Sequence, residues 1–250
     1  MAGSVDRGVD ASRRLAVFDI DGTLTDSHDL DSACYRQALS EVFGFSTVAG
    51  EYQWSDFPDV TDSAILGTLV ERHRGRDVDR DELERFEGAF VERIAAALRD
   101  EPGACRPVTG AVEFLERLAA SRGWRVALAT GGFRRSALLK LMHAGFDPPE
   151  ILASSEDAPR RVGIVGRAVA LATALEGSGF LSIVTLGDGV WDVLTAEELR
   201  VPCVGIGRGE RAGSLSDAGA FTVLADYSDG QRALEVLEAA AAHPTLATSS

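Results

Sequence analysis

Asp19 and Asp21 stand two residues apart at the end of an apolar run that reads VFDIDGTLTDS. Alternate side chains of an extended segment point to the same side, so these two carboxylates lie together and repel each other. A cation between the carboxylates, or protonation of one of them, makes such a pair stable. The pair therefore indicates a site for a metal ion or for proton transfer. Gly22 lets the chain turn away from it, and Thr23 can cap the turn.

Two later apolar runs also end in residues that can contact a ligand. Thr130 and Gly131 follow the apolar run VALA, while the run LSIVTLG leads to Asp188, with Asp192 four residues further on. In a doubly wound sheet, ligands bind beyond the carboxyl ends of the parallel strands, so we expect these groups to meet the first two aspartates. A set of hard oxygen ligands suits Mg²⁺, and the lack of His and Cys in the set counts against zinc.

The elements that would position these residues alternate along most of the chain. Strand-like runs are expected at residues 15–21, 125–130, 150–155, 181–188, 201–207 and 220–226, and helical patterns at 110–120, 134–144, 162–176 and 190–199. This alternation predicts right-handed βαβ units in an α/β fold with a doubly wound parallel sheet. The segment GRGERA, residues 207–212, is interpreted as a loop because no βαβ unit follows it.

A block of helical periodicity interrupts this series after its first strand. Apolar residues recur at helical spacing from about Asp31 to about Arg99, and a linker rich in Pro and Gly follows. We therefore predict an inserted α-helical cap domain, whereas the polar ends of the chain are expected to be disordered. The predicted parts are a core of residues 14–27 and 106–240, a cap of residues 28–105, and tails of residues 1–13 and 241–250.

Three motifs in this order resemble those of the haloacid dehalogenase-like superfamily. They are D-x-D-G-T-[LV] after a strand, a strand-final Thr before glycines, and G-D-x-x-x-D after a later strand. The resemblance covers residues 15–226 and is greatest to the phosphoglycolate phosphatase-like branch with a helical cap. It implies a Rossmann-like core. It also implies that Asp19 is the nucleophile that forms an aspartyl-phosphate, and that Asp21 protonates the leaving group and then activates water.

The resemblance also assigns the remaining site residues. Thr130 and the amide of Gly131 would bind the oxygens of the transferring phosphoryl group. Asp188 would hold Mg²⁺, with Asp192 as a second ligand or as the hydrogen-bonding partner of a ligand. Asp19 and the backbone carbonyl of Asp21 would complete the protein's part of this metal site. A cation is required because a carboxylate attacks an anionic phosphate ester only when the repulsion between them is offset.

The basic residue of the family departs from its usual form here. Members commonly have a lysine shortly after the strand that precedes the last motif, but this stretch reads SSEDAPRRVGI. Arg161 is the best positional match, with Arg160 next, and an arginine can bind a phosphate through two hydrogen bonds. The alternative is that Arg161 lies on the surface in solvent. Lys140, the single lysine of the chain, follows Thr130 on the next helix and is a third candidate.

These observations predict a Mg²⁺-dependent phosphatase that acts on a small soluble phosphate monoester, with the cap closing over the site to exclude water. A phosphomutase of the same superfamily, or a non-catalytic member that binds a phosphorylated ligand, remain alternatives. A phosphonate hydrolase would need a lysine in the cap, which has none. Dehalogenase relatives lack the second aspartate, which Asp21 supplies. Taken singly, each motif could also be a strand end with solvated acids or a helix cap.

Composition narrows the classes of partner. The 250 residues carry a net charge of −14, which argues against nucleic acid or an anionic membrane as the main partner. No segment approaches about 20 consecutive apolar residues, so no membrane span is expected. Three distant cysteines without CxxC pairing indicate free thiols in a reducing compartment. With an N-terminus that lacks an apolar stretch, we expect a cytoplasmic protein; a homodimer is possible.

Overall fold

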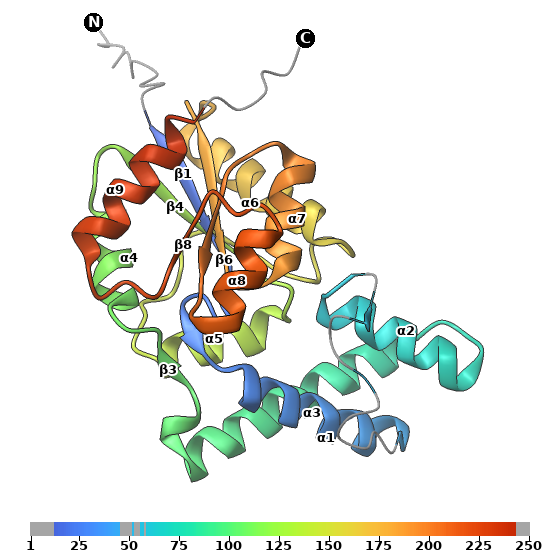
Figure 1. Cartoon of the computed structure of the whole chain (residues 1–250). Coiled ribbons are helices and arrows are strands. Elements are labelled where there is room, and N and C mark those ends of the chain that lie inside the picture. The colour runs from blue at the N-terminus through green and yellow to red at the C-terminus, as the bar shows by residue number, and fades with distance from the viewer. Residues whose placement is uncertain (1–12, 46–51, 53–55, 58, 244–250) are drawn as a thin grey trace, which may run out of the picture.

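The computed structural model describes residues 13–45, 52, 56–57 and 59–243 of the chain (Figure 1). The predicted disordered tails therefore lie outside the described residues, except for Arg13 and residues 241–243. Both ends of the described chain lie on the same side of the molecule, away from the helices that follow the first strand. Within the described chain, no helix combines the length and the apolar character that crossing a membrane requires.

A parallel sheet forms the centre of the fold. Among the described residues its six strands run in the order β5-β4-β1-β6-β7-β8, and all neighbouring pairs are parallel. The chain passes from the central β1 to β4 on one side, and later crosses to β6 on the other side. The strands are β1 (Arg14–Phe18), β4 (Trp124–Ala129), β5 (Leu152–Ala153), β6 (Ile183–Gly187), β7 (Cys203–Ile206) and β8 (Thr222–Leu224). The winding direction thus reverses at β1, where doubly wound sheets bind their ligands.

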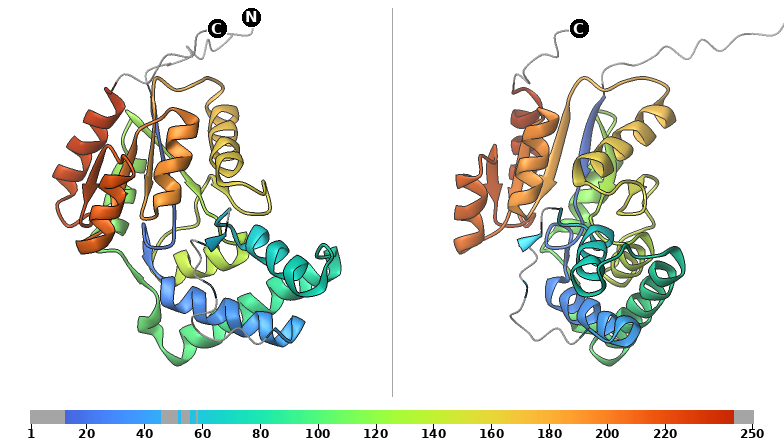
Figure 2. Two further views of the ribbon diagram at one scale, coloured as in Figure 1. Left: turned by 45° about the vertical axis from the view of Figure 1, so that its right-hand side comes forward. Right: turned by 90° about the vertical axis from the view of Figure 1, so that its right-hand side faces the viewer.

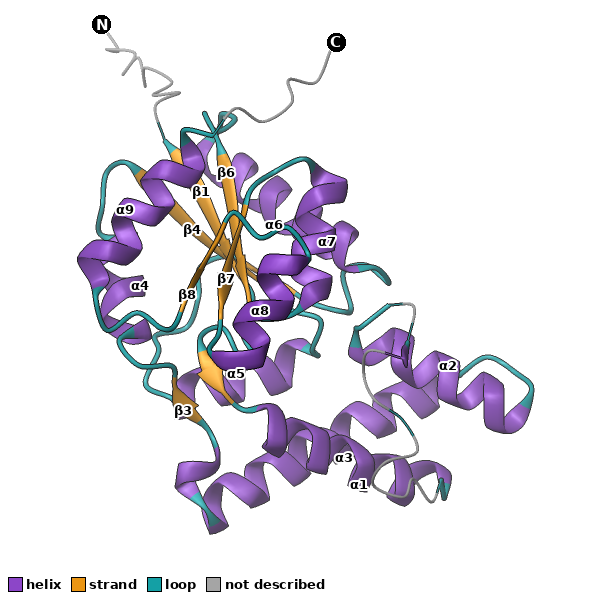
Figure 3. Cartoon of the chain, viewed as in Figure 1, coloured by secondary structure: helices purple, strands orange, loops and turns teal. Residues whose placement is uncertain are grey.

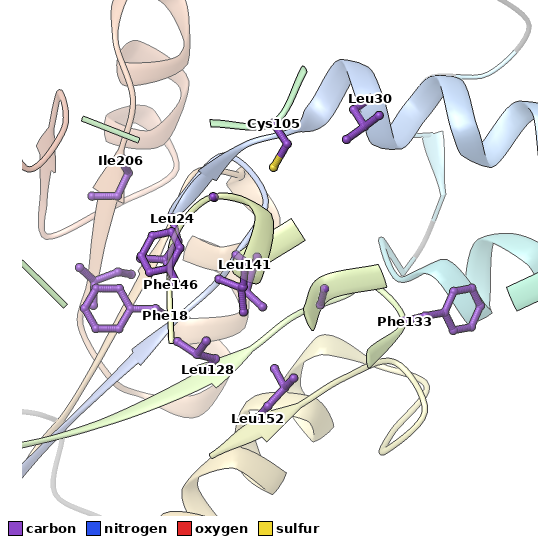
Figure 4. Packing of buried hydrophobic residues seen from close by; sticks show 14 of the residues in the cluster. Phe18, Leu24, Leu30, Cys105, Leu128, Phe133, Leu141, Phe146, Leu152 and Ile206 are labelled. Atoms are coloured by element: carbon purple, nitrogen blue, oxygen red, sulfur yellow. The ribbon is translucent and has the colours of Figure 1, made fainter. Parts of the chain in front are cut away.

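Helices pack on both faces of this sheet (Figure 2), because the strands are buried on both sides. Leu15 and Val17 of β1 share an apolar cluster with α6, whereas Ala16 and Phe18 face the cluster that includes α4 and α9. In that second cluster, Phe18 lies near Leu128 and Ile206 of other strands (Figure 4). The helices of the core are α4 (Ala111–Ala119), α5 (Arg134–His143), α6 (Arg161–Glu176), α7 (Val190–Leu199), α8 (Gly209–Asp217) and α9 (Gly230–Ala241).

In the described part of the chain, three helices are inserted between β1 and β4, and we call them the helical insertion: α1 (His28–Phe43), α2 (Asp62–Arg74) and α3 (Arg80–Asp100). Helices α1 and α3 pack along each other below the sheet (Figure 3). The chain enters through β2 (Thr25–Asp26) and returns through the 3-10 turn η2 (Pro102–Ala104) and β3 (Arg106–Pro107). These two short strands pair antiparallel, so the entry and the exit lie side by side.

Apolar contacts also join the helical insertion to the core. Phe86 and Phe90 lie on the buried face of α3 at helical spacing. Phe133, just before α5, approaches both rings with centroid distances of 6.1 and 6.3 Å. The three rings are fully buried, so the insertion is held against the segment that follows the glycine turn after β4.

The predicted doubly wound α/β fold is confirmed, with differences at the ends of elements. Strand β1 ends before Asp19, and α1 begins at His28 instead of near Asp31. The interpretation of residues 207–212 as a loop is wrong, because α8 begins at Gly209. Helix α8 buries only Leu215 as an apolar residue, so its sequence has little of the periodicity that indicates a helix. Helix α9 lies in the alanine-rich end, where no helix was predicted.

Candidate active site

The segment after β1 is a tight turn that places its two aspartates. The amide of Asp19 donates to the carbonyl of Leu186 on β6 at 2.9 Å, so this residue is still held at the sheet edge. The carbonyl of Ile20 accepts from the amide of Leu24 at 2.8 Å, which folds the chain back. Gly22 has a φ of +81°, and a Cβ there would lie 2.1 Å from Oδ2 of Asp188. The turn therefore needs glycine both for its backbone angle and for space.

Three carboxylates converge at the carboxyl ends of β1 and β6. Asp19, Asp188 and Asp192 are buried, and each offers an oxygen within 4.8 Å of the others. Oδ1 of Asp188 is buried without a hydrogen-bond partner. Because an unpaired buried carboxylate oxygen is costly, this atom and its neighbours fit a hard cation such as Mg²⁺. The carboxylate of Asp21 belongs to a different group of contacts.

Arg161 contacts two members of this cluster, Asp19 and Asp192. Its Nη2 donates to Oδ1 of Asp19 at 2.8 Å and to Oδ1 of Asp192 at 2.6 Å. Burial, and next the charge of Asp192, raise the pKa of Asp19 well above its ordinary value, and the Arg161 guanidinium opposes this rise. Arg160 points elsewhere, toward Glu198. Of the two sequence candidates on this stretch, only Arg161 therefore contacts the predicted nucleophile.

Lys140 is fully buried and contacts the second aspartate of the first motif. Its Nζ lies 2.6 Å from Oδ1 of Asp21 and 2.5 Å from Oδ1 of Asp31 on α1. Ser27 also donates to Oδ1 of Asp21, at 2.5 Å. Burial acts to raise the pKa of Asp21, but the charge of Lys140 and the hydrogen bonds from Lys140 and Ser27 together outweigh it and hold this pKa below the ordinary value. The single lysine thus belongs to Asp21 and does not reach the position opposite Asp19.

The loop after β4 carries the predicted phosphate-binding residues. The hydroxyl of Thr130 accepts a hydrogen bond from the amide of Gly132 at 2.9 Å, which closes the turn. The carbonyl of Gly131 accepts from the amide of Asp62, the first residue of α2, at 2.8 Å. A Cβ at Gly131 would lie 2.5 Å from Nη1 of Arg161. The lack of a side chain therefore lets the loop, the arginine and the helical insertion meet closely.

Sequence reasoning missed two cations that contact Asp188. Nε2 of His28 lies 2.8 Å from its Oδ2, and so does Nη1 of Arg211. The hydrogen bond to Asp188 raises the pKa of His28 to about 9. His28 directly follows the stretch VFDIDGTLTDS, and this position after the first motif was the available signal. Arg211 lies in the segment that was interpreted as a loop, so nothing in its sequence context indicated this contact.

A pocket opens between this edge of the sheet and the helical insertion. Its core side is formed by Asp19, Asp21, Thr130, Gly131, Gly132, Arg161 and Trp191, and its other side by His28, Asp31, Ser32, Tyr35, Val60, Thr61, Asp62 and Ile65. Thus all the predicted site residues except Asp188 and Asp192 line one cavity. The carboxylates of those two lie beside that of Asp19. The arrangement combines a nucleophilic carboxylate, a fixed guanidinium and a glycine turn, which together suit group transfer to or from an oxyanion.

Comparisons with known proteins agree with this fold. A family model described as a hydrolase, haloacid dehalogenase-like hydrolase, matches residues 14–200. No curated protein matches the chain. A hydrolase from Pseudomonas syringae is 23% identical, with a TM-score of 0.66, and the alignment covers 88% of this chain and 97% of that one.

Two further solved structures have the same fold. CbbY from Rhodobacter sphaeroides, in complex with phosphate, is 19% identical with a TM-score of 0.64, covering 86% of this chain and 95% of its own. A predicted phosphoglycolate phosphatase from Haemophilus somnus is 19% identical with a TM-score of 0.62, covering 89% and 98%. At these identities the similarity establishes the fold and not the substrate.

Proposed function

Because the chain belongs to the haloacid dehalogenase-like hydrolases, we propose that it hydrolyses a small soluble phosphate monoester through an aspartyl-phosphate on Asp19. The observation that carries this proposal is the contact of Arg161 with both Asp19 and Asp192, beside the glycine turn after Thr130. A guanidinium fixed next to a buried carboxylate can hold an incoming phosphoryl group against its nucleophile. The pocket above these residues has room for the rest of an ester.

In the first step, an oxygen of Asp19 attacks phosphorus, and the bond from phosphorus to the leaving oxygen breaks. Asp21 gives its proton to that leaving oxygen. In the second step Asp21 takes a proton from water, the water oxygen bonds to phosphorus, and inorganic phosphate leaves with Asp19 restored. The lowered pKa of Asp21 beside Lys140 keeps its carboxylate ionised, which is the state required for the second of these roles.

The other residues hold the reacting groups in place. Arg161, the Thr130 hydroxyl and the amide of Gly131 would bind the phosphoryl oxygens, which carry the negative charge during transfer. Asp19, Asp188, Asp192 and the carbonyl of Asp21 would hold Mg²⁺, which offsets the repulsion between the nucleophile and the ester. Asp188 supplies the unpaired oxygen for this purpose.

The helical insertion is proposed to act as a cap domain. Residues 28–105 would move relative to a core of residues 14–27 and 106–240 about the antiparallel pair of β2 and β3, where both connections cross. In the described conformation, the amide of Asp62 bonds the carbonyl of Gly131, so the insertion touches the phosphate loop directly. Closure of this kind excludes water from the phosphoryl group. A cytoplasmic location and a homodimer remain predictions.

The proposal is tested by the release of phosphate from p-nitrophenyl phosphate with and without Mg²⁺. We expect Mg²⁺-dependent release that falls by at least about 1000-fold in Asp19→Asn, because the amide cannot act as the nucleophile. Asp217→Asn, an exposed aspartate on α8, serves as the matched control and should retain the activity. A phosphate ester that is labelled in its phosphoryl group should leave acid-stable label on the wild-type protein but not on Asp19→Asn. This result would support the aspartyl-phosphate.

The outcome separates the remaining alternatives. A folded wild type that releases no phosphate from any ester, with Mg²⁺ present, contradicts the phosphatase proposal and favours a non-catalytic ligand-binding protein. A phosphomutase would instead transfer the phosphoryl group between hydroxyls of a sugar phosphate, with little release to water. Analysis of the products by phosphorus NMR distinguishes transfer from hydrolysis.

A further inference from the structure

The basic side chains at the pocket are all engaged at its phosphoryl end. Among the described residues, Arg161 and His28 are the basic groups that line the cavity, and Lys140 lies buried beside it. Arg161 contacts Asp19, and His28 contacts Asp188. Each is therefore held by a carboxylate of the candidate catalytic site, where it faces the phosphoryl group of a bound ester. Lys140 likewise bridges two carboxylates and is closed off from solvent.

The opposite wall of the pocket would face the leaving group. Apart from His28, which contacts Asp188, the helical insertion contributes Asp31, Ser32, Tyr35, Val60, Thr61, Asp62 and Ile65 to this wall, and the core adds the ring of Trp191. Two of these residues are acidic, and none of them is basic. Asp31 and Asp62 carry either a negative charge or none, depending on protonation, and neither can balance an anion. This wall suits a group that is neutral or positively charged.

The sequence around the described wall residues also lacks basic groups. From Gln37 to Glu71 the chain contains no Lys, Arg or His, and six of its residues are Asp or Glu. Among the described residues of this side, an anionic group on the substrate would meet no positive charge that is not already paired with a carboxylate.

Several backbone donors of the nearby helix ends are also occupied. The first turn of a helix commonly attracts anions through its free amides. At the start of α2, the amide of Asp62 donates to the carbonyl of Gly131, and that of Ala64 donates to Oγ1 of Thr61. At the start of α5, the amide of Phe133 donates to Oδ2 of Asp62 at 3.0 Å. The protein's own acceptors thus use donors that a substrate carboxylate would otherwise need.

We propose that the group beyond the phosphoryl moiety bears no negative charge: the substrate is a monophosphate of a neutral or amine-bearing alcohol, and esters with a carboxylate or a second phosphate are rejected. This inference rests on the proposed phosphatase function and narrows it. It would separate the chain from two structural neighbours, a predicted phosphoglycolate phosphatase and a variant of CbbY that was crystallised with xylulose-(1,5)bisphosphate. An anion that enters such a site without a counterion is disfavoured.

Three esters of nearly equal size test the proposal: 2-hydroxyethyl phosphate, O-phosphoethanolamine and 2-phosphoglycolate. They differ in the charge of the group at the end of a two-carbon leaving alcohol. We expect kcat/KM for 2-phosphoglycolate to be lower than for 2-hydroxyethyl phosphate by about 100-fold or more, and O-phosphoethanolamine to equal or exceed the neutral ester. Equal or higher kcat/KM for 2-phosphoglycolate would overturn the inference.

A charge placed on the pocket wall gives an independent test. Ser32→Lys adds a cation to the wall, and Ser40→Lys, at an exposed position of the same helix α1, adds the same charge outside the pocket. We expect the ratio of kcat/KM for 2-phosphoglycolate to that for 2-hydroxyethyl phosphate to rise by about 10-fold or more in Ser32→Lys only. Because both esters are compared on one preparation, a partly unfolded variant does not alter the ratio. An unchanged ratio in Ser32→Lys contradicts the proposal.

The reference substrate keeps the two proposals apart. Failure to hydrolyse p-nitrophenyl phosphate as well as all three esters would refute the phosphatase function itself. Hydrolysis of p-nitrophenyl phosphate together with a preference for 2-phosphoglycolate would leave that function intact and refute only the charge selectivity argued from the pocket wall.

Discussion

Arg161 is expected to contribute much of the stability of the metal-free site. Its Nη2 bonds Asp19 and Asp192 at 2.8 and 2.6 Å, and the three side chains are only 13%, 8% and 9% exposed. Removing one partner of a buried ion pair costs about 3 to 5 kcal/mol, because the remaining charge is buried without compensation. Arg161→Met should therefore lower the free energy of unfolding by about this amount. For a chain of this size, that loss lowers Tm by about 6 to 20 °C.

The loss should depend on pH in a defined direction. Burial already raises the pKa of Asp19 above its ordinary value of 3.8, and Arg161 opposes the rise. Without the guanidinium this pKa rises further, so the folded variant binds protons at a pH where the unfolded chain has released them. The full loss in the free energy of unfolding is therefore expected above the pKa that Asp19 has in the folded variant. The loss becomes smaller as the pH falls toward the pKa of the unfolded chain.

Urea unfolding of the metal-free protein, followed by circular dichroism, measures the effect between about pH 5 and pH 8. Arg167→Met is the matched control, because this arginine lies on the same helix α6 and its side chain is 52% exposed. The control should change the free energy of unfolding by no more than about 0.5 kcal/mol. If Arg161→Met unfolds like the wild type, or if its loss is the same at both ends of this pH range, the assignment of Arg161 as the counterion is refuted.

Three further perturbations follow from the structure. Mg²⁺ at about 100 times its Kd should raise the free energy of unfolding by about 2.7 kcal/mol, and a shift that persists in Asp188→Asn would place the metal elsewhere. Gly22→Ala should destabilise the protein more than Gly75→Ala, although both glycines have a positive φ, because a Cβ at Gly22 would lie 2.1 Å from Oδ2 of Asp188 whereas a Cβ at Gly75 has open space. Urea unfolding of both variants measures the difference, and equal losses in the free energy of unfolding would contradict the crowding at Gly22. Glu82 has its pKa lowered to about 2, chiefly by its hydrogen bond from Arg76, so its contribution is present above the ordinary 4.5 and is lost as the pH falls through about 2. Glu82→Gln should accordingly lower Tm at neutral pH, with a difference that disappears near the acid end; a constant difference would argue against the ion pair.

Much of the fold could be predicted because its signals are local. Strand β6 is a short apolar run, and α3 has apolar residues at helical spacing after a capping box of Asp79 and Glu82. The alternation of such elements leaves few topologies, since parallel strands need right-handed crossovers. Helix α8 escaped prediction because Leu215 is the one apolar residue that it buries, so no periodic pattern marks it.

The meeting of Asp19, Thr130 and Asp188 was also determined by the sequence. Each of these residues follows a strand directly, and the carboxyl ends of neighbouring parallel strands share one edge of the sheet. Their sequence separation therefore does not matter once the strand order is known. The residue types, acids beside a hydroxyl and glycines, then predict a site for a cation and an oxyanion at this edge.

Only the tertiary structure decided which cation serves which carboxylate. Arg161 reaches Asp19 from 142 residues away, and Lys140 instead pairs with Asp21. His28, which no motif singled out, contacts Asp188 across 160 residues. A long basic side chain can reach several groups from one backbone position, so its partner depends on how its helix packs and on which carboxylates are buried beside it. That choice lies in the packing of distant elements and has no local pattern in the sequence.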